Sequence, residues 1–174
     1  MPSGSNPDIG AYEYPFGKVI IVPNGYSTIQ SAIDASSTGD TVLVASGTYT
    51  ENIDYGGKNI IVISSHGAKQ TTIIPYNTGI TIVWFANDET RAAKLIGFTL
   101  LNGGDLRGGA INIEGASPTI ENCILIDSKS HAVNSWNSSP KFINCLFTGI
   151  DGRPIYFSTN YAYPEVINCT FVNN

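Results

Sequence analysis

The chain has 174 residues, of which 42% are hydrophobic and only 13% are charged, and its formal net charge is -5. This length suits one domain with a substantial core, and the many β-branched residues are not typical of a disordered chain. The negative charge and the lack of a run of basic residues argue against nucleic acids and anionic membranes as partners. No apolar stretch approaches the length of a membrane span.

The chain divides into three parts. Residues 1–16 are expected to form a tail or a junction with a preceding domain. Residues 17–40 are predicted to contain a first strand and a short helix, and residues 41–174 hold repeated β-like segments. The tail carries three residues that can pack on the rest of the fold: Ile9, Tyr12 and Tyr14.

A capping signal predicts the start of the short helix. The sequence STIQ has the form of a capping box, with Ser27 as the N-cap and Gln30 at the third helical position. One face of the predicted helix is apolar, because it carries Ile29, Ala32 and Ile33. A stack of strands exposes unpaired backbone and apolar core at its end. We therefore expect this helix to cover the first turn of the fold.

The second half of the chain repeats itself. The segments SPTIENCIL, SPKFINCLF and YPEVINCTF share a proline at the same place before a cysteine, and the cysteines follow one another at nearly equal intervals. Each unit consists of short runs rich in Val, Ile, Thr, Phe and Tyr, bounded by Gly, Asn, Pro or Ser, which is typical of strands. A period of roughly 20–30 residues built from strands indicates a solenoid. We predict an all-β fold, a parallel β-helix of about six coils with a short capping helix.

In such a fold, equivalent residues of successive coils lie above one another, about 4.8 Å apart. We predict two structural ladders. The first is an inward column of thiols, continued by Phe98: Cys123, Cys145 and Cys169. The second is a column of amides at a bend: Asn122, Asn144 and Asn168. A zinc site is the alternative for the cysteines, but ligands in one column do not converge on a metal ion, so no metal is expected.

The segments STIQSAIDASSTGDTVLVASGTYTENI and GKNIIVIS resemble the start of right-handed parallel β-helix proteins of the pectin lyase-like superfamily. The later repeats, with GGAI and INCTFVNN, resemble those of bacterial secreted and surface β-helix proteins, including outer-membrane adhesins. The sequence PDIGAYEY resembles a stretch found at the end of β-helix domains in large secreted proteins. The resemblance implies a right-handed coil and a secreted or cell-surface location. It leaves the activity open, because the superfamily holds several enzyme classes and proteins without known catalysis.

The motifs of enzymes in this superfamily are incomplete here. GTYTE at 47–51 resembles an early motif of pectin methylesterases, but the paired-aspartate segment of those enzymes is missing. In DGRPIYF, Tyr156 and Phe157 stand where the resemblance leads us to expect a tryptophan. We therefore interpret Tyr49 and Glu51 as structural residues.

Hydrolysis of a glycosidic bond needs two carboxyl groups within about 5–10 Å of each other. The later coils offer several acidic residues: Asp105, Glu114, Glu121, Asp127, Asp151 and Glu165. We place Glu121 in one column with Lys141 and Glu165, on a turn of mixed charge. No acidic pair stands out among these residues, which argues against this reaction.

A pectate lyase-like β-elimination would use Ca²⁺ held by carboxylates together with a basic side chain. The available basic residues are Arg107, Lys129, His131 and Arg153. His131 and Arg153 share a column with Gly109, so they are the candidate catalytic residues under this alternative. The interpretation we favour places both on exposed turns.

A binding surface follows from the alternation of strand residues. If Ile111, Val133 and Ile155 point inward, their neighbours point outward. The predicted outward strip contains amides, aromatic rings and hydroxyl groups, which suit a sugar: Asn112, Glu114, Asn134, Trp136, Tyr156 and Ser158. Tyr161 and Tyr163 follow nearby in the sequence. An ordinary polar β face is the open alternative.

We therefore expect an extracellular β-helix module without catalytic activity that acts in carbohydrate binding, adhesion or structural spacing, with a polysaccharide or cell-surface glycan as partner. The alternative is a fragment of a Ca²⁺-dependent polysaccharide lyase. The sequence INCTFVNN at 167–174 provides no cap for the last coil. We expect that coil to be covered by another chain, by end-to-end stacking or by a continuation of the chain.

Overall fold

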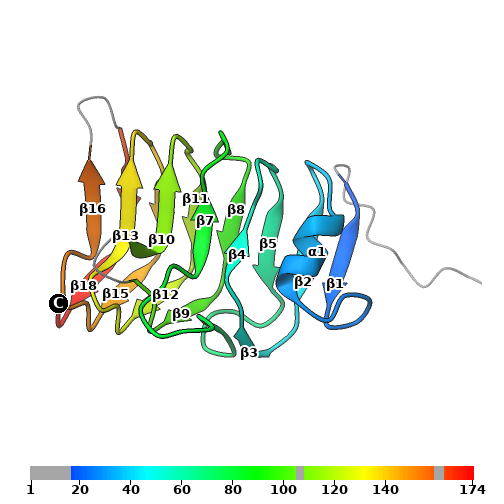
Figure 1. Cartoon of the computed structure of the whole chain (residues 1–174), viewed down its shortest axis with the longest axis horizontal. Helices are drawn as coiled ribbons and strands as arrows, with labels where there is room; N and C mark the ends of the chain where they lie inside the picture. Colours follow the sequence, from blue (N-terminus) through cyan, green and yellow to red (C-terminus); the bar gives the residue numbers. More distant parts are fainter. Residues whose placement is uncertain (1–16, 105–107, 159–162) are drawn as a thin grey trace, which may run out of the picture.

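The computed structural model describes residues 17–104, 108–158 and 163–174 (Figure 1). The predicted tail at 1–16 lies outside the described residues, as do Asp105, Arg107 and Tyr161. The described residues form eighteen strands and one helix. The strands pair in parallel, and they belong to three sheets.

Each sheet collects one strand from successive turns of the chain. The seven-stranded sheet has the order β1 (Val19–Val22), β2 (Thr41–Val44), β5 (Ile61–Ser64), β8 (Lys94–Ile96), β11 (Thr119–Glu121), β14 (Lys141–Ile143) and β17 (Glu165–Ile167). The six-stranded sheet has the order β3 (Gly47–Thr50), β6 (Thr71–Ile74), β9 (Thr99–Leu101), β12 (Ile124–Ile126), β15 (Leu146–Thr148) and β18 (Thr170–Val172). The five-stranded sheet has the order β4 (Ile53–Asp54), β7 (Val83–Phe85), β10 (Gly109–Glu114), β13 (His131–Trp136) and β16 (Ile155–Ser158).

The chain visits the three sheets in rotation, so it winds into a parallel β-solenoid of about six turns (Figure 1). Residues one repeat apart become neighbours on adjacent strands, as in the pairs Ile111 with Val133 and Val133 with Ile155. The predicted all-β coiled architecture is therefore confirmed for this part of the chain. The cause is the repeated order of strands and bends, which returns each strand to a position beside the equivalent strand of the turn before it.

The core fills the inside of the solenoid. Along the strands, every second side chain points inward and is buried, as in β2, where Val42 and Val44 are fully buried. Aromatic residues occupy successive turns of the core, and the rings of Phe147 and Phe171 are stacked with centroids 4.8 Å apart. Apolar side chains stacked at the spacing of the strands leave little room for voids, which stabilises the turns against one another.

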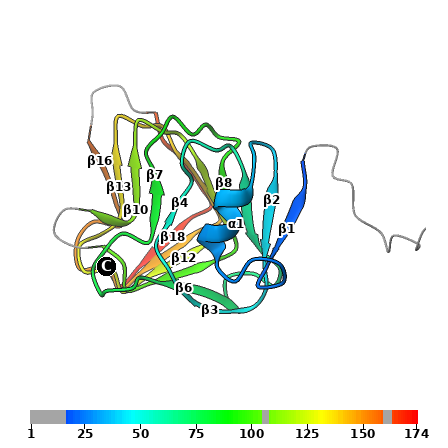
Figure 2. The same cartoon turned by 45° about the vertical axis from the view of Figure 1, so that its right-hand side comes forward.

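The helix α1 (Ile29–Ala35) covers the first turn, and it packs against β1, β2 and β4 (Figure 2). Its buried residues are the three predicted ones: Ile29, Ala32 and Ile33. The predicted cap was wrong by one residue. The N-cap is Thr28, whose hydroxyl group accepts a hydrogen bond from the backbone N–H of Ser31, and the Ser31 hydroxyl group accepts one from the backbone N–H of Thr28.

The N-cap differs from the predicted one because the side chain of Gln30 makes other hydrogen bonds. Its side-chain amide donates to the carboxylate of Asp34 and accepts from the backbone N–H of Asp54 in the five-stranded sheet. Gln30 therefore ties the helix to the solenoid and does not close a capping box.

The described ranges contain no helix that is long and apolar enough to cross a membrane.

The last turn of the described chain leaves inward-facing apolar groups in contact with solvent. Val166 and Phe171 are 43% and 46% exposed, and they line a hollow of about 640 Å³ together with Ile155 and Phe157. The preceding turn buries the equivalent residues Phe142 and Phe147 completely. The expectation that another chain or a continuation covers this turn stays a prediction.

Candidate functional site

The outer face of the five-stranded sheet gathers aromatic, amide and carboxylate side chains, and we call it the aromatic–amide face. Its members belong to two columns defined by the strand register. The first column contains Asp54, Trp84, Asn112, Asn134 and Tyr156. The second column contains Glu114, Trp136 and Ser158. Every residue of the predicted outward strip therefore lies on this one face of the molecule.

Alternation along the strands explains why these side chains point outward. Ile111 and Val133 are completely buried inside the solenoid, and the next residue of each strand is an asparagine on the other face of the sheet. The amide of Asn134 donates a hydrogen bond of 2.8 Å to the side-chain oxygen of Asn112. Asn112 is only 6% exposed, so its amide is nearly excluded from solvent and fixes the partly exposed amide of Asn134.

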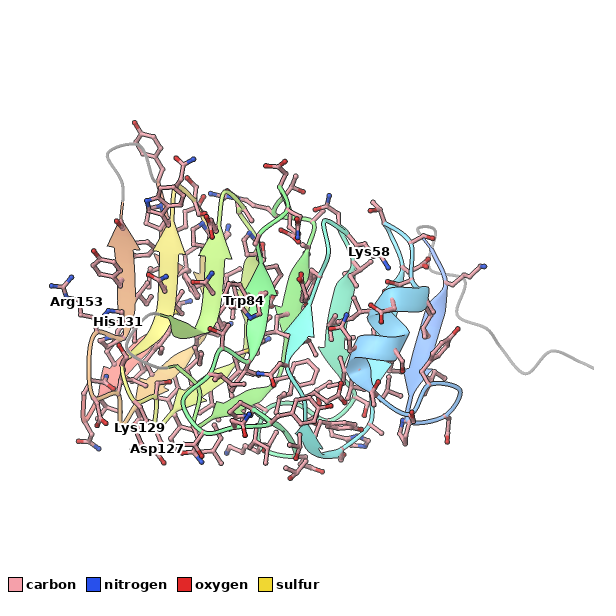
Figure 3. The ribbon with its side chains drawn as sticks, in the orientation of Figure 1. Lys58, Trp84, Asp127, Lys129, His131 and Arg153 are labelled. Carbon is pink, nitrogen blue, oxygen red and sulfur yellow. The ribbon has the colours of Figure 1, made fainter. Side chains whose placement is uncertain are left out.

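Two exposed tryptophans lie beside these two amides. Trp136 is 52% exposed and Trp84 is 39% exposed. Figure 3 labels Trp84 on β7. The sequence interpretation missed Trp84, because the spacing that relates Asn112, Asn134 and Tyr156 does not lead back to it.

Trp84 and Asn112 pair on adjacent strands, as Asn112 and Asn134 do, but more residues of the chain separate Trp84 from Asn112. The cause is that two connections, β7 to β8 and β9 to β10, are both longer than their counterparts in the next turn. The alternating run ITIVWF was the signal that could have revealed Trp84 as an outward residue of a strand.

The residues His131 and Arg153 do lie one turn apart, at one end of the face (Figure 3). The backbone N–H of Arg153 donates a hydrogen bond of 3.1 Å to Nδ1 of His131. The ring of Tyr156 stacks on the ring of His131 with centroids 5.0 Å apart, and the guanidinium group of Arg153 lies 5.0 Å from the centroid of the Tyr156 ring. Burial and the charge of Arg153 lower the pKa of His131, which favours the neutral imidazole.

The predicted column of mixed charge was partly wrong. Lys141 and Glu165 are neighbours, with Nζ and Oε2 3.1 Å apart, and Glu165 also pairs with Arg91. Glu121 instead pairs with Ile143, because it lies two positions further along its strand than the residue equivalent to Lys141. Hydrogen bonds from Arg91 and Lys141 lower the pKa of Glu165.

The remaining acidic residues of the described later coils are scattered. Lys129 and Asp151 form a long ion pair of 3.8 Å, and Asp127 lies in the turn that leads to Lys129 (Figure 3). Among the residues that the structure describes, no three His, Cys, Asp or Glu side chains are grouped so that they could hold a metal ion. Calcium binding under the lyase alternative stays a prediction.

Tyr49 and Glu51 make structural contacts in the first turn. The Tyr49 hydroxyl group donates to the backbone oxygen of Ala45. The carboxylate of Glu51 accepts hydrogen bonds of 3.0 Å from the backbone N–H groups of Ile29 and Gln30. Glu51 is only 4% exposed, so its carboxylate is shielded from solvent and attaches the first turn of α1 to the solenoid through these hydrogen bonds.

The three cysteines occupy one inward column. Cys123 and Cys145 are buried, Cys169 is partly buried, and all three thiols are free. The backbone N–H of Cys145 donates to the sulfur of Cys169 over 3.4 Å. Burial raises the pKa of Cys123 to about 11 and that of Cys145 well above its usual range. These two thiols therefore stay protonated at neutral pH and act as small apolar groups.

The three asparagines of the second ladder form the bend between the seven-stranded and six-stranded sheets. Asn122, Asn144 and Asn168 have φ angles of 52°, 53° and 52°, in the left-handed region that asparagine and glycine tolerate. Nδ2 of Asn144 donates a hydrogen bond of 3.3 Å to Oδ1 of Asn122. Gly97 takes the same place in the turn before, with a φ of 77°.

Comparison of the chain with protein-family models, with curated proteins and with solved structures gave no match.

Proposed function

We propose that this chain is an extracellular β-solenoid module without catalytic activity, and that it binds a carbohydrate on the aromatic–amide face. The proposal includes a similarity to right-handed β-helices of the pectin lyase-like superfamily. It also includes a location at the cell surface or outside the cell. The observation that carries it is the pair of exposed tryptophans, Trp84 and Trp136, on the same face of the sheet as the amides of Asn112 and Asn134.

The chemistry of that strip suits a sugar. Indole rings offer flat apolar faces to the C–H groups of a pyranose. The amide of Asn134, which a hydrogen bond to the nearly buried Asn112 holds in place, offers hydrogen-bonding groups to hydroxyl groups. The strands hold these groups on a rigid frame, which lowers the entropy lost on binding. Adhesion to a glycan-coated surface is one use of such a face, and structural spacing follows from the rigid solenoid that presents it.

Binding to a glycan array tests the proposal. We expect Trp136→Ala and Trp84→Ala each to weaken binding about tenfold, which corresponds to about 1.4 kcal/mol. Tyr26→Ala is the matched control, because Tyr26 is also an exposed aromatic residue (36%) but lies in the loop between β1 and α1. Binding that is unchanged in both tryptophan variants would overturn the proposal.

The second candidate function is a polysaccharide lyase, which the contact between His131 and Arg153 favours. Incubation with acidic polysaccharides, with and without Ca²⁺, tests it through the absorbance of unsaturated products. Product formation that disappears in Arg153→Ala would establish the lyase activity. Absence of product with intact glycan binding would support the module without catalysis.

A further inference from the structure

Glu114 lies close to both tryptophans of the aromatic–amide face. It is directly opposite Trp136 on the neighbouring strand, at about 4.8 Å between backbones. Trp84 pairs with Asn112, two positions before Glu114 on the same face, so the diagonal from Trp84 to Glu114 is about 8 Å. The side chains of tryptophan and glutamate are long enough to meet over these separations.

The carboxylate of Glu114 takes no part in the contacts that hold the described fold together. It is exposed, and no hydrogen bond or ion pair joins it to another residue of the described ranges. The buried carboxylates behave differently, since those of Asp40, Glu51 and Glu89 each accept two backbone N–H groups. Glu114 therefore presents a negative charge to solvent, beside two indole rings.

A carboxylate next to indole faces is suited to an ammonium group. The carboxylate accepts hydrogen bonds from the N–H groups of the cation, and the electron-rich faces of the rings attract its charge. The net charge of -5 adds a general attraction for a polycation and a repulsion for a polyanion.

We propose that the glycan bound by this face carries protonated amino groups, as a polymer of amino sugars with free amines does. One ammonium group lies at Glu114, close to Trp84 and Trp136, and the attached sugar rings stack on the indoles. This inference rests on the proposed carbohydrate-binding function and specifies the class of its ligand.

The described basic residues of the later coils lie away from Glu114 and the two tryptophans. His131 begins the strand that Trp136 ends, so the two lie about 16 Å apart along the strand. Arg153 lies with His131 at the same end of the face (Figure 3), and Lys129 is paired with Asp151. None of these three described basic residues therefore neutralises the charge of Glu114.

Two oligosaccharides of equal length provide the test: glucosamine oligomers, whose amino groups are protonated, and their N-acetylated counterparts, whose amide groups are uncharged. By titration calorimetry at low salt, we expect the glucosamine oligomer to bind about fivefold more tightly. Glu114→Gln should weaken its binding about fivefold and leave the acetylated oligomer unaffected. Added salt should weaken binding of the amine form only, because it screens exposed charges.

Asp127→Asn is the matched control, because Asp127 is also exposed and lies away from Trp84 at a turn (Figure 3). It should leave both affinities unchanged, and an equal effect of Asp127→Asn and Glu114→Gln would overturn the proposal. Equal binding of both oligomers, lost in Trp136→Ala but not in Glu114→Gln, would overturn the amine specificity and leave the carbohydrate-binding function standing. Failure of every glycan on the array to bind would overturn both.

Discussion

The two ends of the solenoid are stabilised in different ways. In the first turns, single carboxylates make unrepeated contacts, as Glu51 does with the helix backbone and Asp40 with the N–H groups of Lys18 and Ser37. In the later turns, the same contacts recur from one turn to the next, as in the thiol column, where Cys123, Cys145 and Cys169 each donate to the backbone oxygen two residues before. The first part is held by a few specific contacts, and the second by many similar ones.

The difference in contacts follows from the position of each turn in the stack. The first turn must end the stack, and a helix cannot pair with strands, so polar side chains have to satisfy its backbone. A turn in the middle pairs with similar neighbours on both sides, so each stack adds a small and similar stabilisation. We therefore expect single substitutions to cost more at the helix than in the repeats.

The largest effect is expected for Glu51→Ala. This change leaves the backbone N–H groups of Ile29 and Gln30 without their carboxylate partner, and we expect a loss of about 3 kcal/mol in the free energy of unfolding. Urea denaturation followed by circular dichroism measures it. Glu114→Ala is the control, because Glu114 is exposed and should change stability by less than about 0.5 kcal/mol. Equal losses in both variants would contradict the comparison.

A smaller effect is expected for Asn144→Ala in the repeats. Alanine is strained at a φ of 53°, and the hydrogen bond to Asn122 is lost, so we expect a loss of about 1–2 kcal/mol in the free energy of unfolding. Asn144→Gly separates the two causes, because glycine adopts this φ without strain, as Gly97 does in an earlier turn. It should cost less than the alanine variant in the same urea titration. A glycine variant as unstable as the alanine variant would show that backbone strain plays no part.

The smallest effect concerns the thiol column, where we expect a difference in reactivity and no change in structure. At pH 8, a thiol reagent should modify Cys169 in the native protein, since it is partly exposed, and spare Cys123 and Cys145. Burial keeps these two thiols protonated, with the pKa of Cys123 at about 11. In denaturant, all three should react. Rapid modification of Cys123 in the native state would refute the buried column.

The repeat predicted a large part of the architecture because the alternation and the period act together. Asn112, Asn134 and Tyr156 are equally spaced in the sequence, and they lie side by side on adjacent strands. Trp84 could not be placed in the same way, because longer connections change the spacing before β10. Glu121 pairs with Ile143 because it lies two positions beyond Thr119, the residue that pairs with Lys141, so a difference of two positions within a strand separates it from the predicted column.

The helix cap illustrates what local sequence leaves open. Ser27 and Thr28 both carry hydroxyl groups, and both can begin a helix. Thr28 is the N-cap because the path of the chain brings Gln30 next to Asp54 and places Glu51 beneath the first turn of α1. These contacts join residues of different turns, so no pattern within the helix predicts them.

The order of residues in this chain is sufficient to specify a stack of parallel strands and the inward or outward direction of most side chains, because hydrogen bonding between equal turns transmits one register from strand to strand. The approach of Glu114 to two tryptophans, and of Glu51 to the helix backbone, required the folded chain. Loops of unequal length separate those groups in the sequence, and only the closed path of the solenoid sets the distance between them.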